Sequence, residues 1–299
     1  MQGAPRLRVL TAVAIDAAAE PFRLAVWGDP IGHSRSPALH RAAYRVLGLD
    51  WEYDRRQVDA AEFDDAVAGL DPTWRGLSLT MPLKERAFDR AEILDDDARL
   101  TGAVNTLLLG AQTRGFNTDV GGLASALLEA GLGSSRRARI LGGGATARSA
   151  LVSLLRLGVA DVEIVTRRAA QADHLVGFAE RIGLRATPAI LDGALRPAPV
   201  DLTVSTLPGT VALADAVAVA LARQGGALFS AAYAPWPTAL VQTWTAQSDA
   251  PVISGLEMLL HQAVRQIRIF RDGSPDRELP DEPGILAVMR TALAERMGD

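Results

Sequence analysis

The chain has 299 residues, a formal net charge of −4 and no cysteine. This length suffices for two hydrophobic cores, and the missing cysteines exclude disulfides and thiolate metal sites. The acidic net charge argues against nucleic acid as a partner. The four histidines lack the spacing of zinc ligands, and no apolar run approaches the ~20 residues that span a bilayer. We therefore expect a cytoplasmic enzyme without a metal.

The N-terminal part alternates strands with helices after an irregular extension. Residues 1–20 join basic and alanine-rich segments that Asp16 interrupts, which favours a disordered extension over a signal peptide. Ser36, followed by Pro37, is typical of the N-cap of a helix that Gly48 ends. Asp59 suits the N-cap of a second helix. Strands are predicted over residues 22–27, 51–58, 76–80 and 103–109.

The pattern changes near Gly121, where strands and helices begin to alternate as in parallel βαβ units. A helix is predicted over residues 123–130, and a helical apolar stripe runs from Leu256 to Phe270. We therefore predict an α/β protein of two domains, one over residues 22–120 that the C-terminal helices of 256–299 complete, and a Rossmann-type doubly wound domain over 121–255. Its strands are expected at residues 138–141, 162–166, 201–205, 227–233 and 252–254.

A glycine-rich turn follows the strand at 138–141 and precedes a helix. Its spacing is G-x-G-x-x-A, in which the glycines permit a tight turn and a close approach of the backbone to a pyrophosphate at the helix N-terminus. The strand–turn–helix context favours a dinucleotide site over a plain tight turn. The predicted cofactor-binding residues here are Gly142, Gly143, Gly144, Ala145, Thr146 and Ala147.

The strand that follows ends at Thr166 and continues into Arg167 and Arg168. A site that selects NAD usually carries an acid at this point to hold the ribose 2′-hydroxyl. Two arginines instead suit a 2′-phosphate, and a guanidinium plane can stack on adenine. Thr166, Arg167 and Arg168 are therefore predicted to bind NADP, although two solvated surface arginines remain the alternative.

Six short motifs follow one another in a fixed order. Gly28 to Pro37 (GDPIGHSRSP) is followed by His40, and then come 78–84 (SLTMPLK), 102–106 (GAVNT), 115–119 (GFNTD), 233–238 (YAPWPT) and 255–262 (GLEMLLHQ). In this order the motifs resemble the signatures of the shikimate dehydrogenase family. The resemblance covers most of the chain and implies an NADP-dependent enzyme that reduces 3-dehydroshikimate to shikimate, in the biosynthesis of chorismate and the aromatic amino acids.

The resemblance also assigns a catalytic pair, because Lys84 and Asp119 match the family's acid/base lysine and aspartate. A lysine ammonium can supply both a proton and a positive charge to the oxygen that becomes negative during reduction. A lysine at a helix start is disfavoured by the helix dipole, so its position calls for another role. Asp119 is equally suited to be the N-cap of the helix near Gly121, and both roles could hold together.

Further residues match family positions that contact substrate or cofactor. Ser34 and Ser36 would hold the substrate carboxylate, although Ser36 as a helix cap is an equal alternative, and Tyr233 would lie nearby unless it only packs. Thr80, Asn105 and Gln262 would hold the ring hydroxyls, with Asn105 as a turn residue the alternative. His40 is expected to be structural. On the cofactor side the resemblance adds Ser205, Thr206 and Gly255.

Three departures from the family pattern leave alternatives open. Ser78 stands where most relatives have asparagine, Ser230 where they often have aspartate, and Val204 to Pro208 replaces the usual nicotinamide-side loop. Quinate or an aminated shikimate analogue is thus a second candidate substrate. A non-catalytic NADP-binding regulator is an alternative from another class, which the Lys84 and Asp119 pair disfavours. A methylene-folate dehydrogenase is a further alternative, which the paired serines Ser34 and Ser36 disfavour. We expect a monomer or a homodimer.

Overall fold

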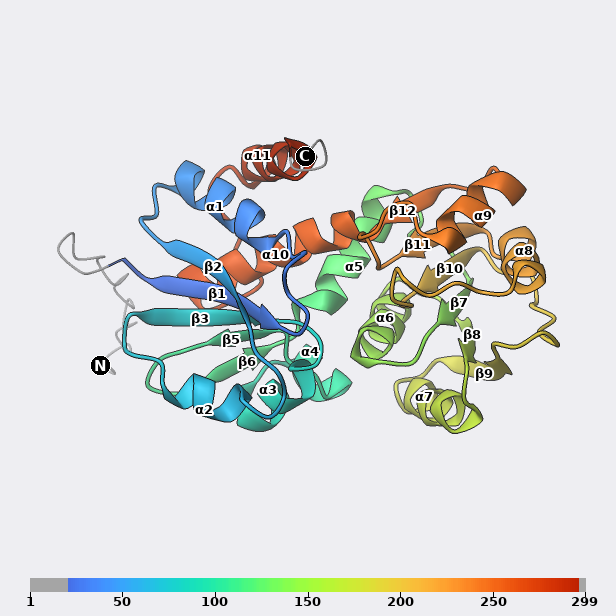
Figure 1. Ribbon diagram of the computed structural model, residues 1–299, viewed down its shortest axis with the longest axis horizontal. Coiled ribbons are helices and arrows are strands. Elements are labelled where there is room, and N and C mark those ends of the chain that lie inside the picture. The colour runs from blue at the N-terminus through green and yellow to red at the C-terminus, as the bar shows by residue number, and fades with distance from the viewer. Residues whose placement is uncertain (1–20, 296–299) are drawn as a thin grey trace, which may run out of the picture.

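Two six-stranded sheets organise the chain in the computed structural model, which describes residues 21–295 (Figure 1). The predicted α/β class and the Rossmann-like second sheet are confirmed. The expectation of a disordered extension over residues 1–20 lies outside the described residues. No helix within residues 21–295 is long and apolar enough to cross a bilayer.

The first sheet is mixed, with the order β2-β1-β3-β5-β6-β4. β1 pairs in parallel with β2 and β3, whereas β5 is antiparallel to β3 and β6. Its strands are β1 (Arg23–Gly28), β2 (Glu52–Gln57), β3 (Trp74–Leu79), β4 (Ile93–Leu94), β5 (Thr106–Leu108) and β6 (Arg114–Phe116).

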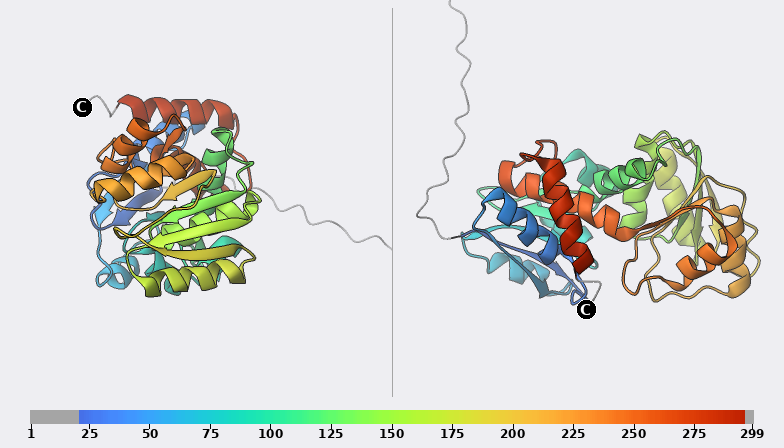
Figure 2. Two further views of the ribbon diagram at one scale, coloured as in Figure 1. Left: turned by 90° about the vertical axis from the view of Figure 1, so that its right-hand side faces the viewer. Right: turned by 90° about the horizontal axis from the view of Figure 1, so that it is seen from above.

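Alternating side chains of β1 build a core on each face of this sheet. Leu24 and Val26 pack toward α1, α10 and α11, and Ala25 and Trp27 toward α2, α3 and α4. The view from above in Figure 2 shows α11 lying over α1. These helices are α1 (Ser36–Leu47), α2 (Phe63–Ala68), α3 (Lys84–Arg90), α4 (Asp96–Thr101), α10 (Gly255–Asp272) and α11 (Glu282–Glu295).

The second sheet is parallel throughout, with the order β12-β11-β10-β7-β8-β9. One face packs against α5 (Thr118–Glu129), α6 and α7, and the other against α8 and α9. Its strands are β7 (Arg137–Leu141), β8 (Asp161–Thr166), β9 (Arg185–Ile190), β10 (Leu202–Ser205), β11 (Ala227–Ser230) and β12 (Val252–Ser254), and its helices are α6 (Ala145–Arg156), α7 (Ala169–Arg181), α8 (Asp215–Gln224) and α9 (Ala239–Gln247).

Two long helices, α5 (Thr118–Glu129) and α10, pack side by side and run between the two sheets (Figure 1). The glycines of α5 permit this contact, because a Cβ at Gly122 would lie 2.9 Å from Cβ of Gln262. α5 begins three residues before Gly121, so the boundary that we proposed there lies inside a helix that both lobes share. The division into 22–120 with 256–299, and 121–255, stays our proposal.

Two predicted helix starts are wrong. α1 begins at Ser36 itself, with Arg35 at the N-cap and no capping side chain. Asp59 accepts hydrogen bonds from the backbone N–H groups of Ala61 and Glu62, so it forms a turn before α2 rather than its cap. A residue type that favours caps can equally satisfy other backbone groups nearby, and the sequence pattern does not distinguish the two.

Asp95 does cap a helix, and its position leads to a prediction about stability. Its side chain accepts from the N–H of Ala98 at 2.7 Å. Burial, together with the neighbouring carboxylates, raises the pKa of Asp95 from 3.8 to about 6 against the effect of this hydrogen bond. Because the folded form holds the proton more tightly than the unfolded form, the stability that this proton confers is lost as the pH rises from about 4 to about 6.

Asp95→Asn should therefore stabilise the protein above pH 6, because asparagine caps a helix as well as aspartate and carries no charge. The gain in the free energy of unfolding is at most about 3 kcal/mol at pH ~7.5 and close to zero at pH ~4. Urea unfolding at the two pH values measures it. Asp201→Asn is the control with the opposite sign, because backbone hydrogen bonds from Arg137 and Arg136 lower the pKa of Asp201. A gain for Asp95→Asn that is equal at both pH values would contradict the prediction.

Candidate active site

A cleft of about 540 Å³ lies between the two sheets, where loops that follow strand ends of both sheets meet. The loops after β1 and β3 and the N-terminal turn of α5 line it from the first sheet. The first turn of α6 and the loops after β10 and β11 line it from the second, and α10 completes the wall. Carboxyl ends of parallel strands are the usual place for ligands in such sheets. Residues from both predicted domains are thus brought to one cavity.

Lys84 and Asp119 form an ion pair inside this cleft. Lys84 is the first residue of α3 and Asp119 lies in the first turn of α5, and Nζ of Lys84 is 2.5 Å from Oδ2 of Asp119. The side chain of Lys84 is 13% exposed and that of Asp119 only 2%. Oδ1 of Asp119 accepts a hydrogen bond from Nδ2 of Asn105 at 2.8 Å. The carboxylate is therefore held at both oxygens, while Lys84 lines the cavity.

The expectation that Asp119 caps α5 is wrong, because Asn117 takes that position. The Asn117 side chain accepts a hydrogen bond from the N–H of Asp119 at 3.0 Å. Its amide nitrogen donates to Thr101 and Ser149, which fixes it between the two lobes. Because Asn117 satisfies the helix end, both oxygens of Asp119 remain available for Lys84 and Asn105.

Lys84 is the single lysine of the sequence, and the 31 lysines and arginines are otherwise all arginines. An arginine cannot release a proton at physiological pH, whereas a lysine can. The chain thus places its only side-chain ammonium in the cleft. The presence of one lysine among 31 basic residues is a signal in the sequence that the motifs do not contain.

The predicted substrate residues gather around this pair, with one exception. Ser34, Ser36, Thr80, Tyr233 and Gln262 all line the cleft. Asn105 is buried behind it and reaches Thr118, Asp119 and Gln262 through hydrogen bonds, so it positions other side chains and does not face the cavity.

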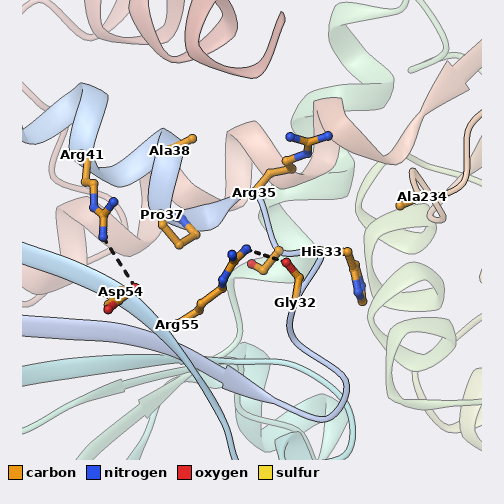
Figure 3. Close-up of a pocket in the computed structure, with 10 residues that line it drawn as sticks. Gly32, His33, Arg35, Pro37, Ala38, Arg41, Asp54, Arg55 and Ala234 are labelled. Atoms are coloured by element: carbon orange, nitrogen blue, oxygen red, sulfur yellow. Dashed lines mark hydrogen bonds and ion pairs between the residues drawn. The ribbon is translucent and has the colours of Figure 1, made fainter. Parts of the chain in front are cut away.

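The mouth of the cleft is positively charged. A side pocket of about 290 Å³ shares His33, Ser34 and Ala234 with the cleft and contains three arginines (Figure 3). Arg41 pairs with Asp54 at 3.6 Å, and Arg55 donates to the backbone oxygen of Gly32. Burial raises the pKa of the Tyr233 hydroxyl, and the positive charge of Arg35 partly opposes this effect. Such a rim favours the approach of an anionic ligand.

His40 is fully buried, and burial lowers its pKa from 6.5 to about 3 despite a hydrogen bond with Gln266. Its ring stacks on Tyr53 at a centroid distance of 3.9 Å. His40 is therefore neutral at physiological pH and does not serve as the acid that protonates a substrate, in agreement with a structural role.

The glycine turn after β7 leads directly into α6, which is the strand–turn–helix context of the predicted dinucleotide site. Gly142 has a φ of 110°, and a Cβ there would lie 2.4 Å from Oγ1 of Thr206. α6 begins at Ala145 with Gly144 at its N-cap and no capping side chain, and a Cβ at Gly144 would meet only open space. Such a terminus can hold a pyrophosphate. Thr146 and Thr206 line the cleft beside it, as does Gly255 at the start of α10.

Arg167 and Arg168 follow β8 and are exposed, with Arg168 at the N-cap of α7. The Thr166 hydroxyl donates to the backbone oxygen of Arg168 and so shapes this turn. Within residues 21–295 neither guanidinium has an ion pair.

Ser205 is buried at the end of β10 and does not line the cleft. Two further polar residues, Gln266 in the cavity wall and the buried Tyr53 behind it, were not among the predicted site residues.

A family profile, a curated relative and a solved structure each show that this chain is similar to shikimate dehydrogenases. A family profile described as the shikimate dehydrogenase substrate binding domain matches residues 26–107. The NADP(+) shikimate dehydrogenase of Methylobacterium radiotolerans is 37% identical over 81% of this chain and 88% of its own. The Thermus thermophilus shikimate 5-dehydrogenase structure, in complex with NADP(H) and shikimate, is 30% identical, covers 91% of this chain and 99% of its own and has a TM-score of 0.74.

The same architecture also occurs with another activity. The structure of a 5-ketofructose reductase from a Gluconobacter species is 25% identical, covers 93% of this chain and 99% of its own and has a TM-score of 0.77. Membership of this group therefore indicates an NAD(P)-dependent dehydrogenase, while the substrate depends on the side chains of the cleft.

Proposed function

Because the chain belongs to the shikimate dehydrogenase family, we propose that it is a shikimate dehydrogenase that reduces 3-dehydroshikimate to shikimate with NADPH. The observation that carries this proposal is the ion pair of Lys84 and Asp119 in the cleft that Thr146 also lines, from the first turn of the helix that follows the glycine turn. A proton donor thus faces a cavity next to the turn that is predicted to bind the dinucleotide. Ser34 and Ser36, which both line the cleft, suit the carboxylate of the substrate.

The proposed chemistry has one proton to move. Bound NADPH supplies the hydride to the ring carbonyl carbon. Lys84 donates a proton from its ammonium to the carbonyl oxygen, and its positive charge stabilises the negative charge that develops there. Asp119 stabilises the ammonium and orients it, while Asn105 keeps the carboxylate in place. In the reverse direction the lysine amine accepts the proton of the alcohol.

Binding of the substrate would then divide between two groups of residues. Ser34 and Ser36 are proposed to donate hydrogen bonds to the carboxylate, with Tyr233 and the charge of Arg35 close by. Thr80 and Gln262 are proposed to hold ring hydroxyls. The cavity of about 540 Å³ has room for a six-membered ring acid beside a nicotinamide.

NADP is the proposed cofactor because Arg167 and Arg168 are free to bind a 2′-phosphate. Changing both to alanine should raise the KM for NADP about tenfold or more and leave the KM for NAD nearly unchanged, since only NADP carries the phosphate. Steady-state kinetics with both cofactors measure this. Arg181→Ala, an exposed arginine at the far end of α7, is the matched control. Equal losses for both cofactors would remove the phosphate role.

A substrate panel tests the function as a whole. Shikimate, quinate and an aminated shikimate analogue are each offered with NADP and with NAD, and the formation of reduced cofactor is followed. We expect the highest kcat/KM for shikimate with NADP. A higher value for quinate or the amine would change the substrate. Cofactor binding without turnover of any of the three would instead favour the non-catalytic regulator.

A further inference from the structure

A chain of buried hydrogen bonds forms one wall of the cleft. The hydroxyl of Tyr53 donates to Oγ of Ser78 at 2.7 Å, and the hydroxyl of Ser78 donates to Oε1 of Gln266 at 2.9 Å. Ser78 and Gln266 line the cavity, although they are only 3% and 2% exposed. The side chain of Ser78 is therefore in contact with the space for substrate while its hydroxyl is already in use.

The orientation of the Gln266 amide is fixed by its other partners. Its Nε2 lies 3.3 Å from the backbone oxygen of Asn105 and 3.0 Å from Oγ1 of Thr106. A backbone oxygen can only accept, so the amino group must face Asn105 and the oxygen Oε1 must face Ser78. A flipped amide would bring two acceptors together in a buried place, which is costly.

His40 supports the same orientation from a second direction. Its Nε2 lies 3.3 Å from Oε1 of Gln266, and its Nδ1 lies 3.0 Å from the hydroxyl of Tyr44. The ring is neutral and carries one proton. Since Oε1 accepts, that proton lies on Nε2, and Nδ1 accepts from Tyr44. Every donor in this chain thus has an acceptor, and reversing any member would leave a conflict with its neighbours.

Ser78 consequently has no proton left for a ligand. It accepts from Tyr53 and donates to Gln266, so only a lone pair of its oxygen remains toward the cavity. We propose that Ser78 determines substrate specificity as an acceptor whose direction is set by Gln266, and that it selects a ring substituent that donates, a hydroxyl or an amino group, against one that cannot. An asparagine at this position could turn either its oxygen or its amino group to the ligand.

This inference rests on the proposed function, so its test uses shikimate and two analogues. In each analogue one of the two hydroxyls that do not react is replaced by fluorine, which resembles a hydroxyl in size but cannot donate. At one ring position the wild type should prefer hydroxyl to fluorine in kcat/KM by about tenfold or more. Ser78→Ala should reduce that preference to near unity and leave the preference at the other position unchanged.

Gln266→Met tests the positioning role. Methionine fills similar space without an oxygen acceptor, so the Ser78 hydroxyl can rotate and donate to the ligand. The preference for hydroxyl over fluorine should fall at the same ring position as in Ser78→Ala, which a merely structural defect would not produce. Gln224→Met, at an exposed position at the end of α8, is the matched control and should keep the wild-type preference at both positions.

The outcomes separate the inference from the function on which it rests. If the wild type oxidises shikimate and Ser78→Ala keeps the wild-type preference at both positions, the inference is overturned and the proposed function stands. If Gln266→Met folds poorly, Ser78→Ala still gives the test, because it removes a single oxygen. A wild type that does not oxidise shikimate would overturn the proposed function, and the paired hydroxyl and fluorine comparison would then be made on the ring acid that it does oxidise.

Discussion

Replacing Lys84 with alanine is expected to lower kcat by ~100- to 10,000-fold, the usual contribution of a positioned proton donor. The ammonium meets a charge that develops only in the transition state, so its loss appears in kcat more than in KM. Alanine also leaves the buried Asp119 carboxylate without its counter-ion, with only the hydrogen bond from Asn105 on Oδ1. Steady-state kinetics normalised to folded enzyme measure the effect.

The Lys84→Arg variant separates the charge from the proton. The guanidinium keeps the positive charge but does not release a proton at the pH of the assay. If Lys84 is the acid, Lys84→Arg should lose nearly as much kcat as Lys84→Ala. A Lys84→Arg variant with kcat near the wild type would show that positive charge alone suffices. Near-normal kcat with a raised KM in Lys84→Ala would move the lysine to a binding role.

The second sheet was largely predictable because apolar strands recur with helices between them. β7, β8 and β10 lie within about a residue of their predicted positions. β4 and β6 were missed, because β4 has only two residues and β6 is Arg-Gly-Phe, which shows no run of apolar residues. β9 was missed because it lacks a long apolar run and contains Pro188, which an edge strand tolerates.

The cleft was predictable from motif order but its hydrogen bonds were not. The motifs name residues that the fold brings together, such as Ser34, Lys84 and Asp119. Nothing in those motifs indicates that Asn105 lies behind the cavity. Gln266 is a polar residue within the buried part of α10, one helical turn after Gln262, and that position was an unused signal. Its amide direction depends on partners up to 226 residues away in sequence, which only the folded chain specifies.

Asp119→Asn should lower kcat by orders of magnitude, because an amide cannot provide the negative charge that stabilises the Lys84 ammonium. The variant also meets a conflict in the structure. Oδ2 of Asp119 faces the ammonium and Oδ1 faces the amino group of Asn105, both of which are donors. Whichever way the new amide turns, its amino group meets a donor, so the free energy of unfolding should also fall, by about 1–3 kcal/mol.

The state of Lys84 in this variant can be read directly, because it is the only lysine. Acylating reagents attack the neutral amine, so Asp119→Asn should speed the acylation of Lys84, located by mass spectrometry of its peptide. Asp201→Asn makes the same chemical change just before β10, where Asp201 binds backbone N–H groups of Arg136 and Arg137 at the opposite end of the sheet. It should alter neither kcat nor the acylation rate. An Asp119→Asn protein that melts earlier yet keeps both its kcat per folded molecule and its acylation rate would show that Asp119 supports the fold and not the proton transfer.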